Sequence, residues 1–283
     1  MIKTVLTDET AGTYTFGGDR TVRRLGFGAM HLTGPGIWGP PPDREAAKAV
    51  LRRAVELGVN LIDTADSYGP GDSEELIAEA LSPYPDDLVI ATKGGLERPD
   101  PAGWSRNGRP EHLKEACEGS LRRLRLDVID VYQLHAPDPQ VPFEESVGAL
   151  ADLREAGKIR HIGVSNVSVE QLRTAQKLAP VVSVQNRYNI GDREYDEIID
   201  ICAEERIGFM PYFPLASGKL PYAPAIDIAL RLDMTWAQVA LAWLLNRADI
   251  VLPIPGTTSI AHLEENVAAA SLRLSDEDID ALT

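Results

Sequence analysis

Four polar side chains whose types suit proton transfer lie at the ends of apolar, strand-like runs. Asp63 and Tyr68 belong to LIDTADSYG, Lys93 ends LVIATK, and His135 ends VIDVYQLH. If these runs are successive parallel strands of one closed sheet, their ends converge on one rim and the four side chains share a pocket. There an ammonium would lower the pKa of the phenol, a carboxylate would hold the ammonium, and an imidazole would orient a carbonyl. The pattern therefore predicts a proton-transfer site.

Each of these residues also has an ordinary structural interpretation. Asp63 could cap a helix or form a turn, and Tyr68 could pack within a loop. Lys93 could be a solvated charge, and His135 could be a hydrogen-bonded core histidine. The joint pattern favours the functional interpretation, because barrel enzymes keep their chemistry at the carboxyl-terminal rim of the strands.

The elements that must position these residues alternate between short Val- and Ile-rich runs and amphipathic stretches. We expect strands at 25–30, 59–65, 87–93, 127–135, 160–166, 180–189, 207–215 and 249–256. We expect helices at 43–57, 110–124, 143–156, 168–178, 192–205 and 235–247. The alternation predicts an α/β fold, a (β/α)8 TIM barrel that forms one domain over residues 1–283. No G-x-G-x-x-G motif follows the first strand, which argues against a doubly wound sheet.

Both ends of the chain carry smaller elements that add to the barrel. The segment TYTFGGDRTVRR predicts a β-hairpin that turns at Gly17–Gly18–Asp19 and plugs the bottom of the barrel. The last residues, SDEDIDALT, predict a short C-terminal helix.

Composition restricts the partners and the setting of the chain. Its 283 residues are 44% hydrophobic and 25% charged, with a net charge of −15. This acidity disfavours nucleic acid and anionic membrane surfaces as partners, and no apolar run reaches the ~18 residues of a membrane span. Cys117 and Cys202 form no C-x-x-C motif, so we expect a reducing, cytoplasmic setting. We expect a monomer or a weak homo-oligomer.

A proton donor alone does not transform a carbonyl, so a second reactant must attack the carbon. The sequence has no G-x-S-x-G elbow and no recognisable nucleophile triad, which leaves a hydride from a cofactor as the simplest attacking species. Over nearly its whole length the chain resembles the aldo-keto reductase family, in LGFGAM, NLIDTADSYG, ATKGG, DVYQLHAPDP, GKIRHIGVSN, VQNRYN, PYFPLASGKL and PIPGTTSIAHLEENVAA. The resemblance implies NADPH-dependent reduction of a small-molecule aldehyde or ketone, with the four rim residues as a catalytic tetrad and Tyr68 as the general acid.

The resemblance also implies where the cofactor would lie. Ser165, Asn166 and Gln185 would hold the nicotinamide carboxamide, and Tyr212 would stack on its ring. The other contacts that it implies are Gly28, Ala29, Met30, Asp63, Pro214, Leu215, Ser217, Gly218, Leu220, Ile254, Gly256, Thr257, Thr258, His262, Glu265 and Asn266. From the residues alone, Ser165 and Asn166 could instead cap the helix that follows them.

The segment for the adenosine end departs from the family pattern. Many members place Lys, Ser and Arg where this chain has Gly256, Thr257 and His262, and those groups grip the 2′-phosphate of NADPH. A histidine is mostly uncharged at neutral pH, so the positive charge here is weak. We expect NADPH as the cofactor, with NADH as the alternative.

The substrate end is expected to be open and partly aromatic. Its predicted residues are Met30, Trp38, Tyr68, Trp104 and His135. The chain ends at Thr283, soon after Asn266, so it lacks the long C-terminal loop of selective members, and we expect a broad range of small carbonyl substrates. Two alternatives stay open: a nicotinamide-nucleotide sensor with slow turnover, and a lyase in which Lys93 forms a Schiff base.

Overall fold

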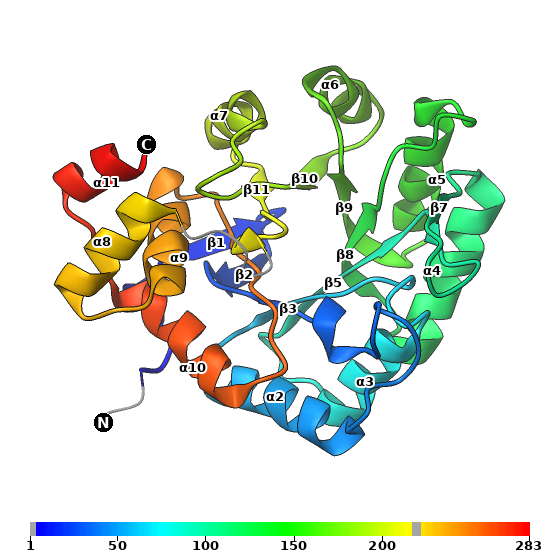
Figure 1. Cartoon of the computed structure of the whole chain (residues 1–283). Coiled ribbons are helices and arrows are strands. Elements are labelled where there is room, and N and C mark those ends of the chain that lie inside the picture. The colour runs from blue at the N-terminus through cyan, green and yellow to red at the C-terminus, as the bar shows by residue number, and fades with distance from the viewer. Residues whose placement is uncertain (1–3, 217–221) are drawn as a thin grey trace.

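A curled parallel sheet forms the centre of the computed structural model, which describes residues 4–216 and 222–283 (Figure 1). Its seven strands lie in the order β11-β10-β9-β8-β5-β4-β3. Their bounds are β3 Phe27–Gly28, β4 Leu61–Asp63, β5 Val89–Gly94, β8 Ile129–Leu134, β9 Ile159–Ser165, β10 Val181–Gln185 and β11 Gly208–Phe209. Every pairing is parallel, and each strand pairs with the next strand of this sheet along the chain. That order fits a barrel and not a doubly wound sheet, in which the strand order reverses.

An eighth segment, residues 250–256, continues the sheet beyond β11. Phe209 of β11 forms a parallel bridge with Val251, and its N–H donates to the Ile250 carbonyl at 2.8 Å. The N–H of Leu252 donates back to the Phe209 carbonyl, also at 2.8 Å. The segment therefore occupies the place of the expected last strand.

The same segment reaches β3 and brings the two edges of the sheet together. Gly26 donates to the Pro253 carbonyl at 2.9 Å, and Gly28 donates to the Pro255 carbonyl at 3.4 Å. The two prolines have no N–H to return, so this closing seam is hydrogen-bonded in one direction only and is not a regular strand pair. The arrangement fits a (β/α)8 barrel.

Helices surround the sheet (Figure 1). Their bounds are α2 Arg44–Glu56, α3 Asp72–Leu81, α4 Pro110–Leu124, α5 Phe143–Glu155, α6 Val169–Leu178, α7 Asp196–Glu205, α8 Ala223–Leu232, α9 Trp236–Arg247 and α10 Ile260–Ala268. Shorter helices are α1 Asp8–Ala11, η1 Met30–Leu32, η3 Ala269–Ser271 and α11 Asp276–Leu282. Within the described ranges no single helix has the length and apolar composition of a membrane span, and α8 and α9 reach them only as a pair that bends by 103°.

Local sequence explains where several of these helices begin. Asp43 accepts a hydrogen bond from the Ala46 N–H at 2.9 Å and caps α2, as its position after a run of prolines predicts. Ser168 and Thr235 form capping boxes at the starts of α6 and α9. The helices α3 and α8 were not expected. Neither has a side-chain hydrogen bond from its N-cap residue, which is Gly71 for α3 and Tyr222 for α8.

The N-terminal hairpin pairs β1 Thr13–Phe16 with β2 Arg20–Arg23. It lies against the amino-terminal ends of the barrel strands: the Tyr14 hydroxyl donates to the Arg206 carbonyl at 2.7 Å, just before β11. At its turn, Gly17 has φ +56°, and a β-carbon there would lie 2.0 Å from the His161 ring. Glycine is therefore required by both the backbone angle and the close approach.

A second, much smaller ribbon lies in the long connection between β5 and α4. It pairs β6 Leu96–Glu97 with β7 Ser105–Arg106 in an antiparallel arrangement. These strands were not predicted, because each has only two residues and so no alternating pattern. This ribbon sits at the carboxyl-terminal side of the barrel, where the predicted site lies.

Candidate active site

A buried ion pair joins two of the predicted catalytic residues. Asp63 ends β4 and Lys93 lies in the neighbouring β5. The Lys93 ammonium donates to both Asp63 carboxylate oxygens, at 2.9 and 2.8 Å, and to the Thr64 carbonyl at 2.7 Å. Its side chain is 0% exposed. All three ammonium hydrogens are therefore used, which offsets the cost of burying the charge.

Gln185, at the end of β10, adds to this arrangement from the far side of the barrel. Its amide donates to Asp63 Oδ1 at 2.9 Å and to Gln133 Oε1 at 3.1 Å. Side chains from β4, β5, β8 and β10 are thus tied together across the barrel. The Asp63 carboxylate is therefore held by both an ammonium and an amide.

Tyr68 and His135 complete the cluster. His135 directly follows β8, and Tyr68 lies in the loop between β4 and α3. Their rings meet edge to face, with centroids 5.8 Å apart and an interplanar angle of 81°. The Lys93 ammonium lies 5.3 Å from the centroid of the Tyr68 ring. The structure therefore brings all four predicted residues together.

Burial raises the pKa of Tyr68 well above its usual range, and Asp63, Tyr212 and Asp66 add to the effect. The net shift of this pKa is opposite to the lowering predicted from Lys93, whose ammonium donates its hydrogens to Asp63 and Thr64 and not to the phenol. Burial also lowers the pKa of Lys93, against the opposing effect of Asp63. Tyr68 is consequently a protonated phenol, which is the form that donates a proton.

His135 is uncharged at neutral pH. Burial lowers its pKa well below the usual value, and the nearby Lys93 ammonium lowers it further. Its Nδ1 lies 3.4 Å from the Ser67 hydroxyl, and its backbone N–H donates to the Gly94 carbonyl at 2.8 Å. The ring is therefore held from one side, and Nε2 is the nitrogen that can reach a ligand.

The cluster lies at one end of a cavity of ≈ 920 Å³. Most of its lining was predicted: Gly28, Met30, Asp63, Tyr68, Trp104, His135, Ser165, Asn166, Gln185, Tyr212, Pro214, Leu215, Ile254, Gly256, Thr257, His262, Glu265 and Asn266. The cavity runs from the ion pair and phenol to the start of α10, so it spans both the predicted chemistry and the predicted cofactor segment.

Several predicted residues do not line this cavity. Ala29 and Lys93 are buried beneath it, and Thr258 is exposed outside it. Trp38 packs against the Arg98 guanidinium, whose Cζ lies 5.5 Å from the Trp38 ring centroid. The predicted contacts Ser217, Gly218 and Leu220 lie outside the described residues.

The residues predicted to hold a carboxamide are interconnected. Asn166, with φ +58°, donates to the His135 carbonyl at 2.9 Å and accepts from the Tyr212 hydroxyl at 2.7 Å. The helix cap at this place is Ser168 and not Ser165 or Asn166, so the capping interpretation of that pair is wrong. Ser165 and Asn166 face the cavity instead.

Sequence reasoning missed some of the lining. These residues are His31, Ile37, Leu96, Phe213, Thr235, Trp236, Ala237 and Pro255. Three of them lie at the start of α9: the N-cap Thr235, and Trp236 and Ala237. The helix was predicted, but not which of its ends faces the cavity. The capping box at Thr235 was a readable signal of a helix start near the site.

The end of the cavity near α10 is more open. Ser259 caps α10, and its N–H donates to the Thr257 hydroxyl at 3.0 Å. His262 and Glu265 lie on the exposed side of the helix. Among the described residues that line the cavity, none is Lys or Arg. Any anionic ligand group at this end would rely on backbone amides and on hydroxyl and imidazole groups.

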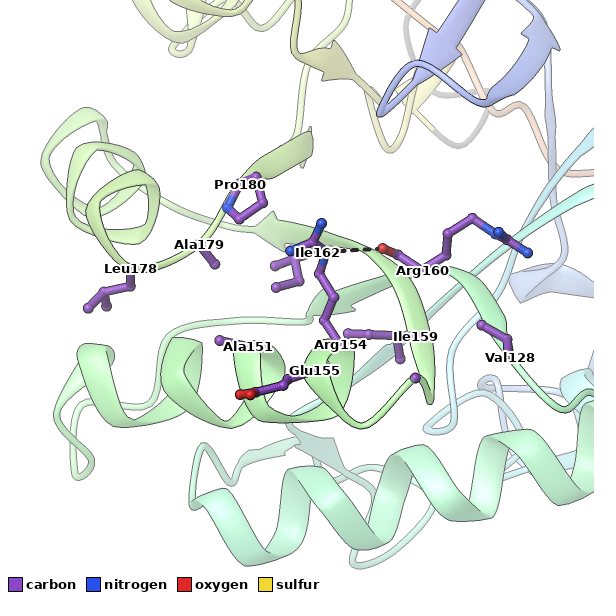
Figure 2. Close-up of a pocket in the computed structure, with 11 residues that line it drawn as sticks. Val128, Ala151, Arg154, Glu155, Ile159, Arg160, Ile162, Leu178, Ala179 and Pro180 are labelled. Carbon is purple, nitrogen blue, oxygen red and sulfur yellow. Dashed lines mark hydrogen bonds between the residues drawn. The ribbon is translucent and has the colours of Figure 1, made fainter.

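A second hollow of ≈ 640 Å³ lies between α5, α6 and the amino-terminal end of β9 (Figure 2). Arg154 crosses it and donates to the Arg160 carbonyl at 3.3 Å. Its charged side chains, including Glu155, are exposed to solvent. None of the predicted site residues lies there, whereas most of them line the first cavity.

A parallel barrel with a buried ion pair, a protonated phenol and a neutral imidazole at the carboxyl ends of its strands has the arrangement expected of a barrel enzyme. The model of the Aldo/keto reductase family matches residues 24–283. The chain belongs to the aldo/keto reductase family, a family of oxidoreductases.

Individual relatives agree with this assignment. The chain is 46% identical over 281 residues to the pyridoxine 4-dehydrogenase of Escherichia coli (strain K12), covering 96% of this chain and 98% of that protein. It is 47% identical over 262 residues to an uncharacterised oxidoreductase of Schizosaccharomyces pombe, covering 92% and 85%. The crystal structure of an aldo/keto reductase from Klebsiella pneumoniae in complex with NADP and acetate superposes with a TM-score of 0.80 at 30% identity, covering 95% and 93%.

Proposed function

We propose that this protein reduces small aldehydes and ketones to alcohols with NADPH, and that Tyr68 donates the proton. The observation that carries the proposal is a buried, protonated Tyr68 phenol edge to face with a neutral His135 at one end of a cavity of ≈ 920 Å³. Cavities of about this size are typical of small-molecule and cofactor sites.

The residues present fit a nicotinamide dinucleotide. Ser165, Asn166 and Gln185 offer a hydroxyl and two amides to a carboxamide, and Tyr212 offers a ring face beside them. The N-terminal amides of α10 suit phosphate groups. The related Klebsiella pneumoniae structure contains NADP. When bound, the cofactor supplies a hydride to the carbonyl carbon.

The side chains of this protein then act on the carbonyl oxygen. His135 donates a hydrogen bond from Nε2–H to the carbonyl oxygen and orients the carbonyl. The Tyr68 O–H bond breaks as its proton moves to the oxygen, so the product is a neutral alcohol. Lys93 is close enough to stabilise the phenolate that remains, and Asp63 keeps Lys93 in place. Full burial with every ammonium hydrogen engaged argues against Lys93 as a Schiff-base nucleophile.

The cavity favours apolar, ring-shaped substrates without strict selection. Its substrate side includes Met30, Ile37, Leu96, Trp104 and Phe213. The described lining ends at Asn266, and the C-terminal helix α11 packs against α8. Because the Escherichia coli relative is a pyridoxine 4-dehydrogenase, pyridoxal is the first natural aldehyde to test.

The test combines turnover with removal of one oxygen atom. Purified protein should oxidise NADPH in the presence of 4-nitrobenzaldehyde or pyridoxal, and Tyr68→Phe should lower kcat by about 10²-fold or more with an unchanged Kd for NADPH. Tyr84→Phe is the matched control, since the Tyr84 hydroxyl donates only to the Leu124 carbonyl, away from the cavity. A much smaller loss of kcat in Tyr68→Phe would remove Tyr68 from the role of general acid.

The same measurements decide between the enzyme and a sensor. A sensor would bind NADPH tightly and show no oxidation of bound NADPH by 4-nitrobenzaldehyde in a single turnover. The cofactor preference is decided by kcat/KM for each nucleotide: a value for NADH equal to or above that for NADPH would contradict the preference proposed.

A further inference from the structure

A buried arginine outside the tetrad joins two loops that wall the cavity. Arg98 is only 7% exposed, and it follows the short strand β6. Its guanidinium donates to four backbone carbonyls: Gly103 at 2.8 Å, Ile37 at 2.9 Å, Gly36 at 3.0 Å and Pro101 at 2.7 Å. Two acceptors belong to the loop before α2 and two to the loop between β6 and β7. One side chain thus crosslinks two loops far apart in sequence.

Two tryptophan rings pack against the same guanidinium. Its Cζ lies 4.1 Å from the ring centroid of Trp104 and 5.5 Å from that of Trp38. Burial lowers the pKa of Arg98, and Asp100 opposes the shift. A planar group with several fixed N–H donors can satisfy four carbonyls and stack on an indole at once, whereas a lysine ammonium cannot.

The crosslink holds Ile37 in an unfavourable conformation. Ile37 has φ +60°, a left-handed angle that costs a β-branched residue energy. Its carbonyl accepts from Arg98 and from the Gly69 N–H at 3.3 Å, and Gly69 directly follows Tyr68. The Ile37 side chain lines the cavity. The contacts of Arg98 therefore fix one wall next to the loop of the proton donor.

We propose that Arg98 is a positioning residue that sets substrate selectivity, by holding Ile37 and Trp104 as the apolar walls of the substrate end. The proposal rests on the proposed carbonyl reduction. Arg98 does not itself line the cavity, so it acts through those two side chains. Substrates with a ring contact the walls, whereas the smallest aldehydes occupy only the space beside Tyr68 and His135. Loss of Arg98 should therefore change KM for ring substrates and leave kcat and small substrates alone.

The main test is Arg98→Lys, which keeps the charge and removes the planar fork. KM for 4-nitrobenzaldehyde should rise about five- to tenfold, which is the effect expected from the loss of one aromatic contact. KM for propanal and kcat for both substrates should stay within about twofold of the wild-type values. The matched control is Arg106→Lys, an exposed arginine in the same connection, on β7. It should leave every constant within about twofold.

A second variant protects the test against misfolding of the first. Trp104 is 44% exposed, so Trp104→Leu should fold, and it should raise KM for 4-nitrobenzaldehyde as Arg98→Lys does. The rise in KM in the double variant should be smaller than the product of the two single rises, because both changes remove the contact of Trp104 with the substrate. Acrylamide quenching gives a readout that needs no turnover. The fluorescence of Trp104 is the difference between a protein that has Trp104 and the matching Trp104→Leu variant, and acrylamide should quench it more strongly in Arg98→Lys.

The outcomes are distinguishable from failure of the proposed reaction. Equal rises in KM for propanal and 4-nitrobenzaldehyde, a fall in kcat at constant KM, or an unchanged KM in Trp104→Leu would each overturn the role of Arg98. If the wild-type protein reduces no aldehyde, carbonyl reduction fails instead. In that case the Kd of 4-nitrobenzaldehyde, measured by tryptophan fluorescence, replaces KM, and the same ratio between variant and wild type decides.

Discussion

The two ends of the main cavity use their polar groups in opposite ways. At the tetrad end, Asp63 and Lys93 are buried and every ammonium hydrogen has an acceptor. At the α10 end, Thr257 is half-buried and His262 and Glu265 are exposed. Preorganised, water-excluded groups stabilise developing charge strongly, whereas exposed groups contribute little and can vary at small cost to the fold. We therefore expect the proposed chemistry to depend on groups in the core, and the choice between NADPH and NADH to depend on groups at the surface.

The largest expected effect follows from breaking the buried pair. Lys93→Met leaves the Asp63 carboxylate in the core without a cation, so the free energy of unfolding should fall by about 3–5 kcal/mol, measured by urea denaturation. Lys114→Met is the control, because Lys114 pairs with Asp152 at 2.8 Å on the surface, with side chains 46% and 63% exposed. It should cost less than about 1 kcal/mol. Equal losses of unfolding free energy in the two variants would contradict a larger contribution from the buried pair than from the exposed one.

A smaller effect concerns protonation of His135. Its pKa in the folded state lies well below the usual value, while the unfolded chain takes up a proton below about pH 6.5. The free energy of unfolding should therefore fall as the pH drops below about 6.5, with a slope from this group of at most ~1.4 kcal/mol per pH unit. His135→Asn lacks this group, so its unfolding free energy should depend less steeply on pH between about 6.5 and 5. Parallel curves for the two proteins would contradict a buried, neutral His135.

The smallest effect belongs to the exposed end. His262→Arg adds a fixed positive charge where the family resemblance places the 2′-phosphate, so Kd for NADPH should fall about fivefold, with Kd for NADH and kcat within about twofold. Isothermal titration with both nucleotides measures this difference. A large change in kcat would show that the two ends of the cavity are not independent.

The sequence predicted the elements whose signals are local. Asp43 predicted the start of α2. The positions of Asp63, Lys93 and His135 at strand ends were enough to predict that the three side chains lie in one cluster. The helix α3 was missed because it follows Gly71 in a left-handed conformation and has no capping side chain. Trp38 and Trp104 both lie in loops, and only the tertiary contacts of Arg98 direct one of them into the cavity.

The pKa of Tyr68 could not be predicted from its neighbours along the chain. Its direction depends on burial and on which acceptors the Lys93 ammonium prefers, and both are properties of the folded barrel. The cavity lining near α10 was predicted more fully, since Gly256, Thr257 and Asn266 lie close together in sequence. Residues of α9 were missed there because a helix pattern does not show which end faces a cavity.

The closing seam of the barrel has a consequence for exchange with solvent. Gly26 and Gly28 donate to prolines that return no hydrogen bond, so this edge should open at lower cost than the fully paired β8 and β9, and its amides should exchange sooner. Gly28 lines the cavity on one side of the seam, and Ile254 and Gly256 line it on the other. A bound ligand that touches both sides would stabilise the closed seam, so exchange of the seam amides should slow when the ligand is present.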